Sequence, residues 1–206
     1  MGSMDVVHPA TTHPLRTPAT LAVGGLWVMA ALSALKALST PWVPDADGGT
    51  AALLDVLSTL LVVGWIYTAV TFLMWLYRAR ENLDRRGDTA LTWKKGWTIG
   101  GWFIPVADLF IPAAVVSEVF ARSRPGAFRT WKVPRLVVVW WVAFVLGLIR
   151  FTFTTVYADG TRHVTGVQFW NAVNGVAGAV AAVLAVRIVQ QVTAWQSGDD
   201  WSAGAR

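Results

Sequence analysis

Two carboxylic acids, Asp108 and Glu118, lie in an apolar, tryptophan-rich stretch that runs from residue 97 to residue 121. A carboxyl group that aromatic rings shield from water can hold a proton near neutral pH and deliver it to a substrate. If the protein is a membrane-embedded enzyme, these residues are its catalytic candidates, and aromatic faces would stabilise positive charge on an apolar, isoprenoid-type substrate. The simpler interpretation is structural: Asp108 caps a short helix that starts at Pro112, and Glu118 pairs with Arg122.

A second group of residues predicts ligand binding around the same stretch. Arg78 and Asn82 are four residues apart, so they share one face of a helix that ends before it. A basic residue near a membrane surface attracts anionic headgroups by about 1 kcal/mol, and indole rings prefer the headgroup region. We therefore expect a lipid, an amphipathic small molecule or a membrane partner to bind here. The predicted ligand-binding residues are Arg78, Asn82, Trp97, Trp102 and Phe103.

Polar residues also recur inside the apolar segments, at one level of the protein. Asp55 lies one turn into the predicted span of residues 51–77, and Arg150 lies toward the far end of the predicted span of residues 135–157. The helical rise therefore places them at comparable depth, where they could form an ion pair. Gln168, Asn171 and Asn174 start the last span at spacings of three, near one helical face. This intramembrane polar layer is either a structural clamp or a ligand site. Small residues beside it predict close helix packing: Gly175, Gly178 and Ala182.

The composition excludes several classes of site. The chain has 206 residues and no cysteine, which rules out disulfides, thiolate catalysis and cysteine-ligated metals. The motifs of serine hydrolases, zinc proteases, P-loop proteins and dinucleotide-binding folds are absent, and the three histidines form no cluster. We therefore expect no metal and no cofactor. The net charge of +5 comes without a nucleic-acid-binding motif, so we expect no nucleic-acid partner.

The hydropathy indicates an all-α integral membrane protein. Apolar residues make up 55% of the chain and charged residues only 14%, against about 25% charged in soluble domains. Four uninterrupted stretches are long enough to cross about 30 Å of hydrocarbon: residues 19–38, 51–77, 135–157 and 167–186. A fifth apolar segment, residues 97–121, is interrupted by Pro105 and Pro112, which break a helix.

Basic residues flank the interrupted segment on both sides. Because such residues concentrate on the cytoplasmic side of a membrane, we expect the segment to enter and leave on that side. The prediction is four transmembrane helices plus a Pro-broken, Trp-rich re-entrant or interfacial hairpin. We expect residues 1–18 to form a disordered cytoplasmic tail, residues 19–192 the membrane domain and residues 193–206 a second cytoplasmic tail. The sequence is compatible with a homo-oligomer. Eleven of the 17 basic residues make up the flanks: Arg78, Arg80, Arg85, Arg86, Lys94, Lys95, Arg122, Arg124, Arg129, Lys132 and Arg135.

The same segment resembles a bacterial membrane family catalogued as a domain of unknown function (DUF 4328). The family pattern is a W-x-x-R…N helix end followed by W-x-x-G-x-W-F-x-P-V-A-N-L-x-x-P, and the resemblance covers residues 53–191. It implies the architecture and a bacterial inner-membrane location, but no activity. One departure is Asp108, where the family usually has asparagine. The matching residues are Trp75, Arg78, Asn82, Trp97, Gly100, Trp102, Phe103, Pro105, Val106, Ala107, Leu109 and Pro112.

Overall fold

The computed structural model describes residues 13–39, 48–125, 133–149, 151, 153–157, 162–165, 167–198 and 201. Within these ranges the side chains of residues 39, 48–55, 153–155, 162–165, 167 and 168 are not described. The predicted ion pair and the expected disordered tail before residue 13 therefore lie outside the described part. Three residues of the predicted polar layer are affected: Arg150 entirely, and the side chains of Asp55 and Gln168.

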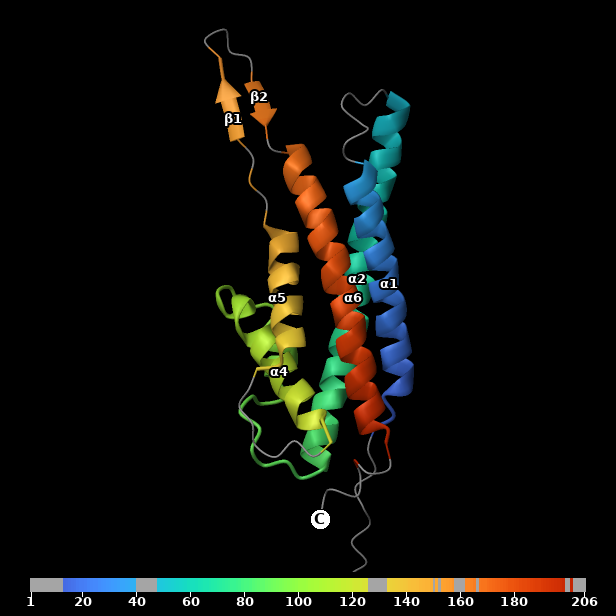
Figure 1. Ribbon diagram of the computed structural model, residues 1–206, viewed down its shortest axis with the longest axis vertical. Coiled ribbons are helices and arrows are strands. Elements are labelled where there is room, and N and C mark those ends of the chain that lie inside the picture. Colours follow the sequence, from blue (N-terminus) through green and yellow to red (C-terminus); the bar gives the residue numbers. More distant parts are fainter. Residues whose placement is uncertain are drawn as a thin grey trace, which may run out of the picture.

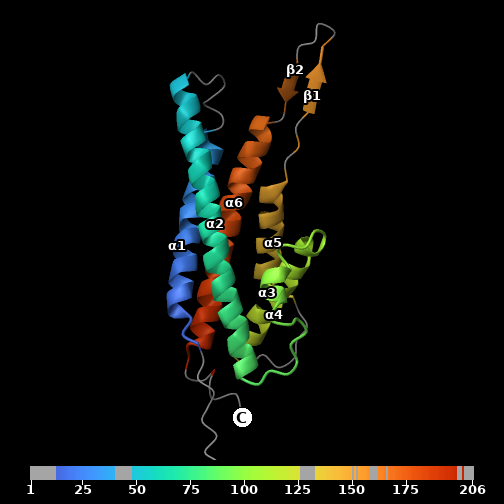
Figure 2. The same cartoon turned by 180° about the vertical axis from the view of Figure 1, so that it is seen from behind.

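Three long helices run side by side through the protein (Figures 1 and 2): α1 (Arg16–Ser39), α2 (Gly48–Arg85) and α6 (Val167–Gln196). Helix α1 packs against both α2 and α6, and the shorter α5 (Arg135–Leu148) packs against α6. Each of the three long helices is long and apolar enough to cross a membrane. Much apolar surface remains on the outside, as on α2, where Val62 and Val63 are each 59% exposed. The fold is therefore a helical bundle of a membrane protein.

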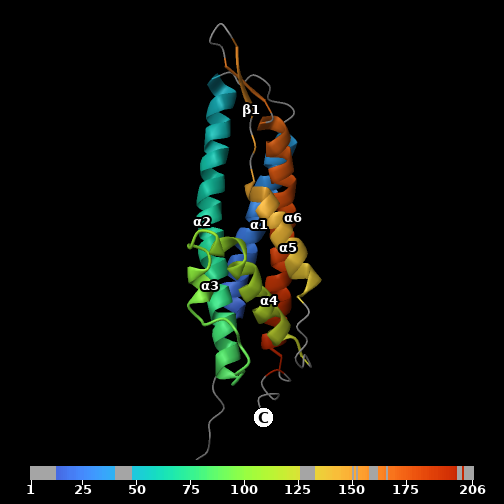
Figure 3. The ribbon, with the colours of Figure 1, turned by 90° about the vertical axis from the view of Figure 1, so that its left-hand side faces the viewer.

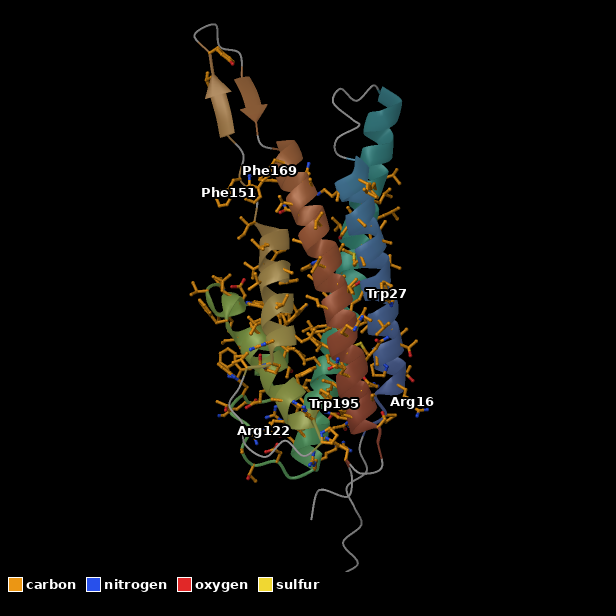
Figure 4. All side chains as sticks on the ribbon, in the orientation of Figure 1. Arg16, Trp27, Arg122, Phe151, Phe169 and Trp195 are labelled. Atoms are coloured by element: carbon orange, nitrogen blue, oxygen red, sulfur yellow. The ribbon has the colours of Figure 1, made fainter. Side chains whose placement is uncertain are left out.

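One end of the bundle carries most of the described basic side chains, and we call it the basic end. It is the end at which α1 begins and α2 and α6 finish, and Figure 4 shows Arg16 and Arg122 there on opposite sides. Trp195 lies at this end, whereas Phe151 and Phe169 lie toward the opposite end (Figure 4). Aromatic residues thus mark both ends of α6, as at the two surfaces of a membrane.

Glycine allows α1 and α6 to approach closely, which confirms the predicted small-residue face. A Cβ atom added to Gly175 would lie 2.7 Å from both the Ser33 carbonyl oxygen and the Ala37 Cβ atom. A Cβ atom on Gly178 would lie 3.2 Å from the Ser33 hydroxyl. Without a hydrophobic driving force in lipid, such close backbone packing is a main source of helix association.

Residues 97–123 form a hairpin whose two ends both lie toward the basic end (Figure 3). Helix α3 (Trp97–Gly100) leads into a tip, residues 103–110, that contains the short 3-10 helix η2 (Ala107–Leu109). Helix α4 (Ile111–Ser123) then returns and packs against α2, α5 and α6. Gly101 is needed at the bend because an added Cβ atom would lie 2.7 Å from the Ile111 Cγ2 atom.

The chain after α5 differs from the prediction of a span over residues 135–157. Helix α5 ends at Leu148, and its 14 residues cover about 21 Å at a rise of 1.5 Å per residue. Two short antiparallel strands follow, β1 (Phe153–Val156) and β2 (Arg162–Thr165), beyond the start of α6 (Figure 1). The β-branched residues Thr154, Thr155 and Val156 favour this extended backbone over a helix.

We expect Gly175→Ala to lower the free energy of unfolding by about 1–3 kcal/mol, because the new methyl group would overlap with α1. Thermal unfolding in a mild detergent measures the effect. The matched control is Gly24→Ala on α1, where an added Cβ atom has no neighbour within 4 Å. Because alanine favours a helix more than glycine, that variant should be neutral or slightly more stable. Equal destabilisation by both changes would contradict the close contact.

Candidate functional site

A network of amide and hydroxyl groups joins four segments of the chain at the basic end. The Asn82 carboxamide is 1% exposed. It accepts a hydrogen bond from the His13 backbone N–H (2.7 Å) and donates to the His13 carbonyl (3.0 Å) and Gln196 Oε1 (3.1 Å). Gln196 Nε2 donates in turn to the Ala79 carbonyl (3.1 Å) and Ser123 Oγ (2.7 Å). Asn82, a predicted ligand-binding residue, is therefore occupied as a clamp between helices.

A second hydrogen bond between α2 and α6 lies further from the basic end, one turn before Gln196 along α6. The fully buried Trp75 donates from Nε1 to Thr193 Oγ1 at 3.0 Å. Thr193 and Gln196 had not been singled out from the sequence. A signal was present, because polar residues one turn apart near the end of an apolar helix need partners at that level. Trp75 and Asn82, seven residues apart on one face of α2, supply them.

Arg78 and Asn82 share a helical face as predicted, but the structure does not join them to the hairpin tryptophans. Among the described residues, no hydrogen bond links either of them to Trp97 or Trp102. The arginine that reaches the loop before the hairpin is Arg80, which sequence reasoning missed. Arg80 is 3% exposed and donates to the Trp93 carbonyl at 2.7 Å. It also forms an ion pair with Asp84, one turn further along α2.

The loop between α2 and α3 has a second attachment to α2 through Glu81. This carboxylate accepts a hydrogen bond from Lys95 Nζ at 3.2 Å and lies 3.1 Å from His13 Nε2. The hydrogen bond to Glu81 raises the pKa of Lys95 above its usual value. The Lys95 ammonium therefore stays charged, and the ion pair holds the loop beside the end of α2.

Glu118 on α4 anchors the same loop from the other side. Its two carboxylate oxygens accept hydrogen bonds from the backbone N–H groups of Thr92 (2.5 Å) and Trp93 (3.2 Å). The predicted pairing of Glu118 with Arg122 is wrong. Arg122 instead donates to the Ala90 carbonyl of the loop at 2.9 Å, and its Nη1 atom lies 3.7 Å from Asp88 Oδ1. The loop draws both side chains away from each other, a long-range effect that local spacing does not reveal.

The tip of the hairpin is apolar and exposed. Phe103, Val106 and Phe110 are 73%, 72% and 69% exposed. Val106 has a φ of 69°, a left-handed conformation that costs a non-glycine residue about 1–3 kcal/mol. The indole of Trp141 on α5 holds this turn by donating to the Leu109 carbonyl at 2.9 Å. A strained turn is thus fixed at one point while its side chains stay uncovered.

Asp108 lies in η2 at this tip and is exposed. The residue before the first turn of α4 is Phe110, and no side chain caps that helix. The prediction that Asp108 caps a helix starting at Pro112 is therefore wrong. The helix starts at Ile111, and Asp108 belongs to the 3-10 turn that precedes it. Among the residues that the structure describes, none forms an aromatic pocket around this carboxyl group, and its side chain is exposed.

The hairpin tryptophans pack against the bundle. The Trp102 ring lies edge-on to Phe72 of α2 and to Trp141 and Phe144 of α5, with centroid distances of 6.1, 5.9 and 6.0 Å. Trp97 is half-buried, and its ring lies edge-on to the indole of Trp93 in the preceding loop. Both therefore hold the stem of the hairpin in place. Of the three predicted aromatic ligands, Phe103 alone projects outward.

Three exposed basic residues surround the open end of the hairpin. Lys94 precedes α3, Arg124 follows α4 and Arg135 begins α5. In the part of the chain that the structure describes, none of the three has a hydrogen bond or an ion pair. We call these three residues the cation patch, because Lys94 and Arg124 stand at the two ends of the hairpin and Arg135 begins α5, which packs against α4.

The predicted polar layer is present in part. Asn174 is 6% exposed, and neither of its amide atoms bonds to any described group. Asn171, one turn closer to the start of α6, is half-buried. No described side chain clamps Asn174 to another helix, so the described residues supply no support for a structural clamp.

The family model described as domain of unknown function (DUF4328) matches residues 40–194. The match includes the hairpin, its loop and Asn82, and it stops two residues before Gln196. Neither a curated protein nor a solved structure matches the chain. The predicted membership of this family is therefore confirmed.

We expect Glu118→Ala to free the loop between α2 and α3, because the backbone N–H groups of Thr92 and Trp93 lose their acceptors. Hydrogen exchange at these two amides should accelerate by about tenfold or more, as a lost hydrogen bond of about 1–3 kcal/mol predicts. Ser117→Ala, one residue away on α4, is the matched control and should leave both amides slow. Unchanged exchange in Glu118→Ala would show that Glu118 does not anchor the loop.

Proposed function

We propose that the hairpin of this chain, which belongs to the DUF4328 family, binds an anionic amphipathic lipid at the membrane surface of the basic end. The observation that carries this proposal is the hairpin with an uncovered apolar tip at one end and, at its open end, a cation patch whose side chains have no partner among the described residues. Phe103, Val106 and Phe110 would enter the acyl chains, and Lys94, Arg124 and Arg135 would meet the headgroup. An amphipathic ligand needs both surfaces.

The exposure of the tip supports insertion into lipid. Large apolar side chains that gather in one exposed segment mark an interaction surface. The stem of the hairpin is fixed by Trp102 and Glu118, so the tip is presented rather than free to fold back. The strain at Val106 fits a segment that is kept for its position and not for its own stability.

The charges support an anionic partner and an orientation. Lys94, Arg124 and Arg135 are exposed at the end where basic residues concentrate. The positive-inside rule then places this end in the cytoplasm, with both termini. In this orientation the hairpin is re-entrant, and α5 completes a fourth crossing. Phe151 just beyond it packs against Trp170, with ring centroids 5.2 Å apart, near the opposite surface.

No observation favours the alternative of acid catalysis. Both oxygens of Glu118 accept backbone hydrogen bonds, and Asp108 is exposed rather than enclosed by aromatic rings. A general acid needs a substrate site beside it. The described residues place neither carboxyl group in such a site, so lipid binding is the function that the geometry supports best.

We expect replacement of Lys94, Arg124 and Arg135 by glutamine to weaken binding of phosphatidylglycerol by about 100-fold. The estimate follows from about 1 kcal/mol for each basic residue near an anionic surface. Native mass spectrometry of the detergent-purified protein with added lipid measures the affinity.

The matched control removes the same charge elsewhere, through Arg16→Gln, Arg78→Gln and Arg187→Gln. The side chains of these residues also have no partner among the described residues, and they lie outside the cation patch. They should change affinity only a few-fold. An equal loss in both triple variants would show that net charge decides binding, and not the hairpin.

We expect Asp108→Asn to move the tip deeper into the membrane. A charged aspartate costs about 2.5–3.5 kcal/mol at the centre of a bilayer, so its removal favours insertion. Because the chain has no cysteine, Phe103→Cys provides a single attachment site for an environment-sensitive dye. The dye should shift to shorter wavelength and be quenched more strongly by brominated lipids in Asp108→Asn. Asp108→Glu, which keeps the charge, should leave both signals unchanged, and a shallower tip in Asp108→Asn would contradict insertion.

A further inference from the structure

Arg187 is the one charged residue in the sequence of α6, and its side chain is exposed. In the described part of the chain its guanidinium group has no hydrogen bond and no ion pair. It directly follows the apolar stretch of residues 167–186, which spans about 30 Å, the thickness of the hydrocarbon core. Arg187 therefore lies near the boundary between acyl chains and headgroups, on the side of the basic end. Anionic lipid headgroups are the counter-ions available at that depth.

An apolar groove along the contact of α5 with α6 lies on the same face of α6 as Arg187. Val176 and Val180 line its α6 wall, and both are exposed. Arg187 comes 11 residues after Val176 and seven after Val180. At 3.6 residues per turn, these spacings bring it to within about 20° of each valine around the helix axis. The groove wall and Arg187 therefore belong to one strip of α6.

Arg135 has the same relation to the α5 wall of the groove. Leu146 lines that wall, and it comes 11 residues after Arg135, which again gives about 20° around the helix axis. Val139 and Val142 lie between them on α5, and all three apolar side chains are exposed. An uncovered apolar strip thus leads from Arg135 to the groove.

The two arginines lie at comparable depth, at the mouth of the groove. Helices α5 and α6 run side by side in opposite directions (Figure 1). They meet at Gly147, where an added Cβ atom would lie 3.5 Å from the Gly178 nitrogen. Toward the basic end, Arg135 is 12 residues from Gly147 and Arg187 is nine residues from Gly178. These separations are about 18 Å and about 13.5 Å along the helices, a difference that two long, flexible side chains can bridge.

We infer that Arg135 and Arg187 bind the phosphate of an anionic phospholipid whose acyl chain lies in the α5–α6 groove. The two charges decide the occupant, because basic pockets between transmembrane helices bind anionic headgroups. A second copy of the chain, packed through the same surface, would place like charges against each other, which is unfavourable. The described lining of the groove has no charged residue, so it suits the chain of the lipid and not its headgroup.

This site is distinct from the lipid site proposed at the hairpin. The two sites share Arg135, but the second cation here is Arg187, and the apolar wall belongs to the bundle. The groove site needs neither Lys94 nor Arg124, and it does not use the tip of the hairpin. The failure of one site can therefore be recognised without the failure of the other.

The test uses the full-length protein in phosphatidylcholine nanodiscs that contain a trace of one photoreactive lipid. One probe is phosphatidylglycerol with a diazirine in the middle of one acyl chain, and the other is phosphatidylcholine with the same chain. Mass spectrometry locates the cross-links. In the wild type, the α6 segment of residues 172–180 should react with the phosphatidylglycerol probe at least about fivefold more than with the phosphatidylcholine probe. The estimate follows from about 1 kcal/mol for each basic residue near an anionic headgroup.

Three single variants measure the contribution of the charge. Arg187→Gln should lower labelling by the phosphatidylglycerol probe about fivefold, and unchanged labelling by the other probe shows that the groove is still folded. Arg187→Lys keeps the charge and should keep most of the preference. Arg16→Gln is the matched control, because it removes another exposed charge of the basic end, and it should leave the preference intact.

Equal labelling of the wild type by both probes, or a preference that survives in Arg187→Gln, would overturn the proposal. So would an equal loss in Arg187→Gln and Arg16→Gln, because net charge and not the groove would then decide binding. The double variant with Lys94→Gln and Arg124→Gln lacks the two cations that the hairpin site alone uses. It should keep the preference at residues 172–180, and a loss there would show that the hairpin and not the groove holds the lipid.

Discussion

The Asn82 carboxamide is the point at which the N-terminal segment, α2 and α6 meet, and Gln196 extends this contact to α4 through Ser123. The loss of one partner from such a buried network leaves another polar group unpaired, which costs more than the bond itself contributes. The ends of these segments are therefore fixed relative to one another. The hairpin depends on this arrangement, because its returning helix packs against the two helices that the network aligns.

The polar groups near the hairpin divide into two classes. Glu118, Arg80 and Lys95 are used to hold the loop between α2 and α3, and Trp102 and Trp141 hold the stem and the turn. These groups are committed to structure. What is left uncovered is apolar at the tip and basic at the open end, and this division gives the hairpin the amphipathic surface on which the proposed lipid binding rests.

The apolar runs predicted the three long helices, and the small residues after Asn174 predicted their close packing, because both depend on local sequence and on the thickness of a membrane. The polar residues near the end of α6 indicated that partners were needed, but which residues anchor one another could not be predicted from the sequence. Asn82 meets Gln196, and Glu118 meets the backbone of Thr92, across long separations in the chain. Local rules instead favoured a cap for Asp108 and an ion pair of Glu118 with Arg122. In the structure, Asp108 caps no helix and long-range contacts keep Glu118 and Arg122 apart. After α5, β-branched residues form a strand where the apolar run had predicted a longer helix.

Asp108 lies in the exposed tip of the hairpin. Its side chain caps no helix and is open to the surroundings, so its replacement by asparagine would leave the ends of the helices unchanged. In the proposed lipid-bound state, the main consequence of such a change would fall on the transfer of the tip into lipid, where a charge is costly. One residue would then set the depth of the tip. The turn itself stays held by the bond from Trp141 to a backbone carbonyl, which is independent of the side chain at position 108.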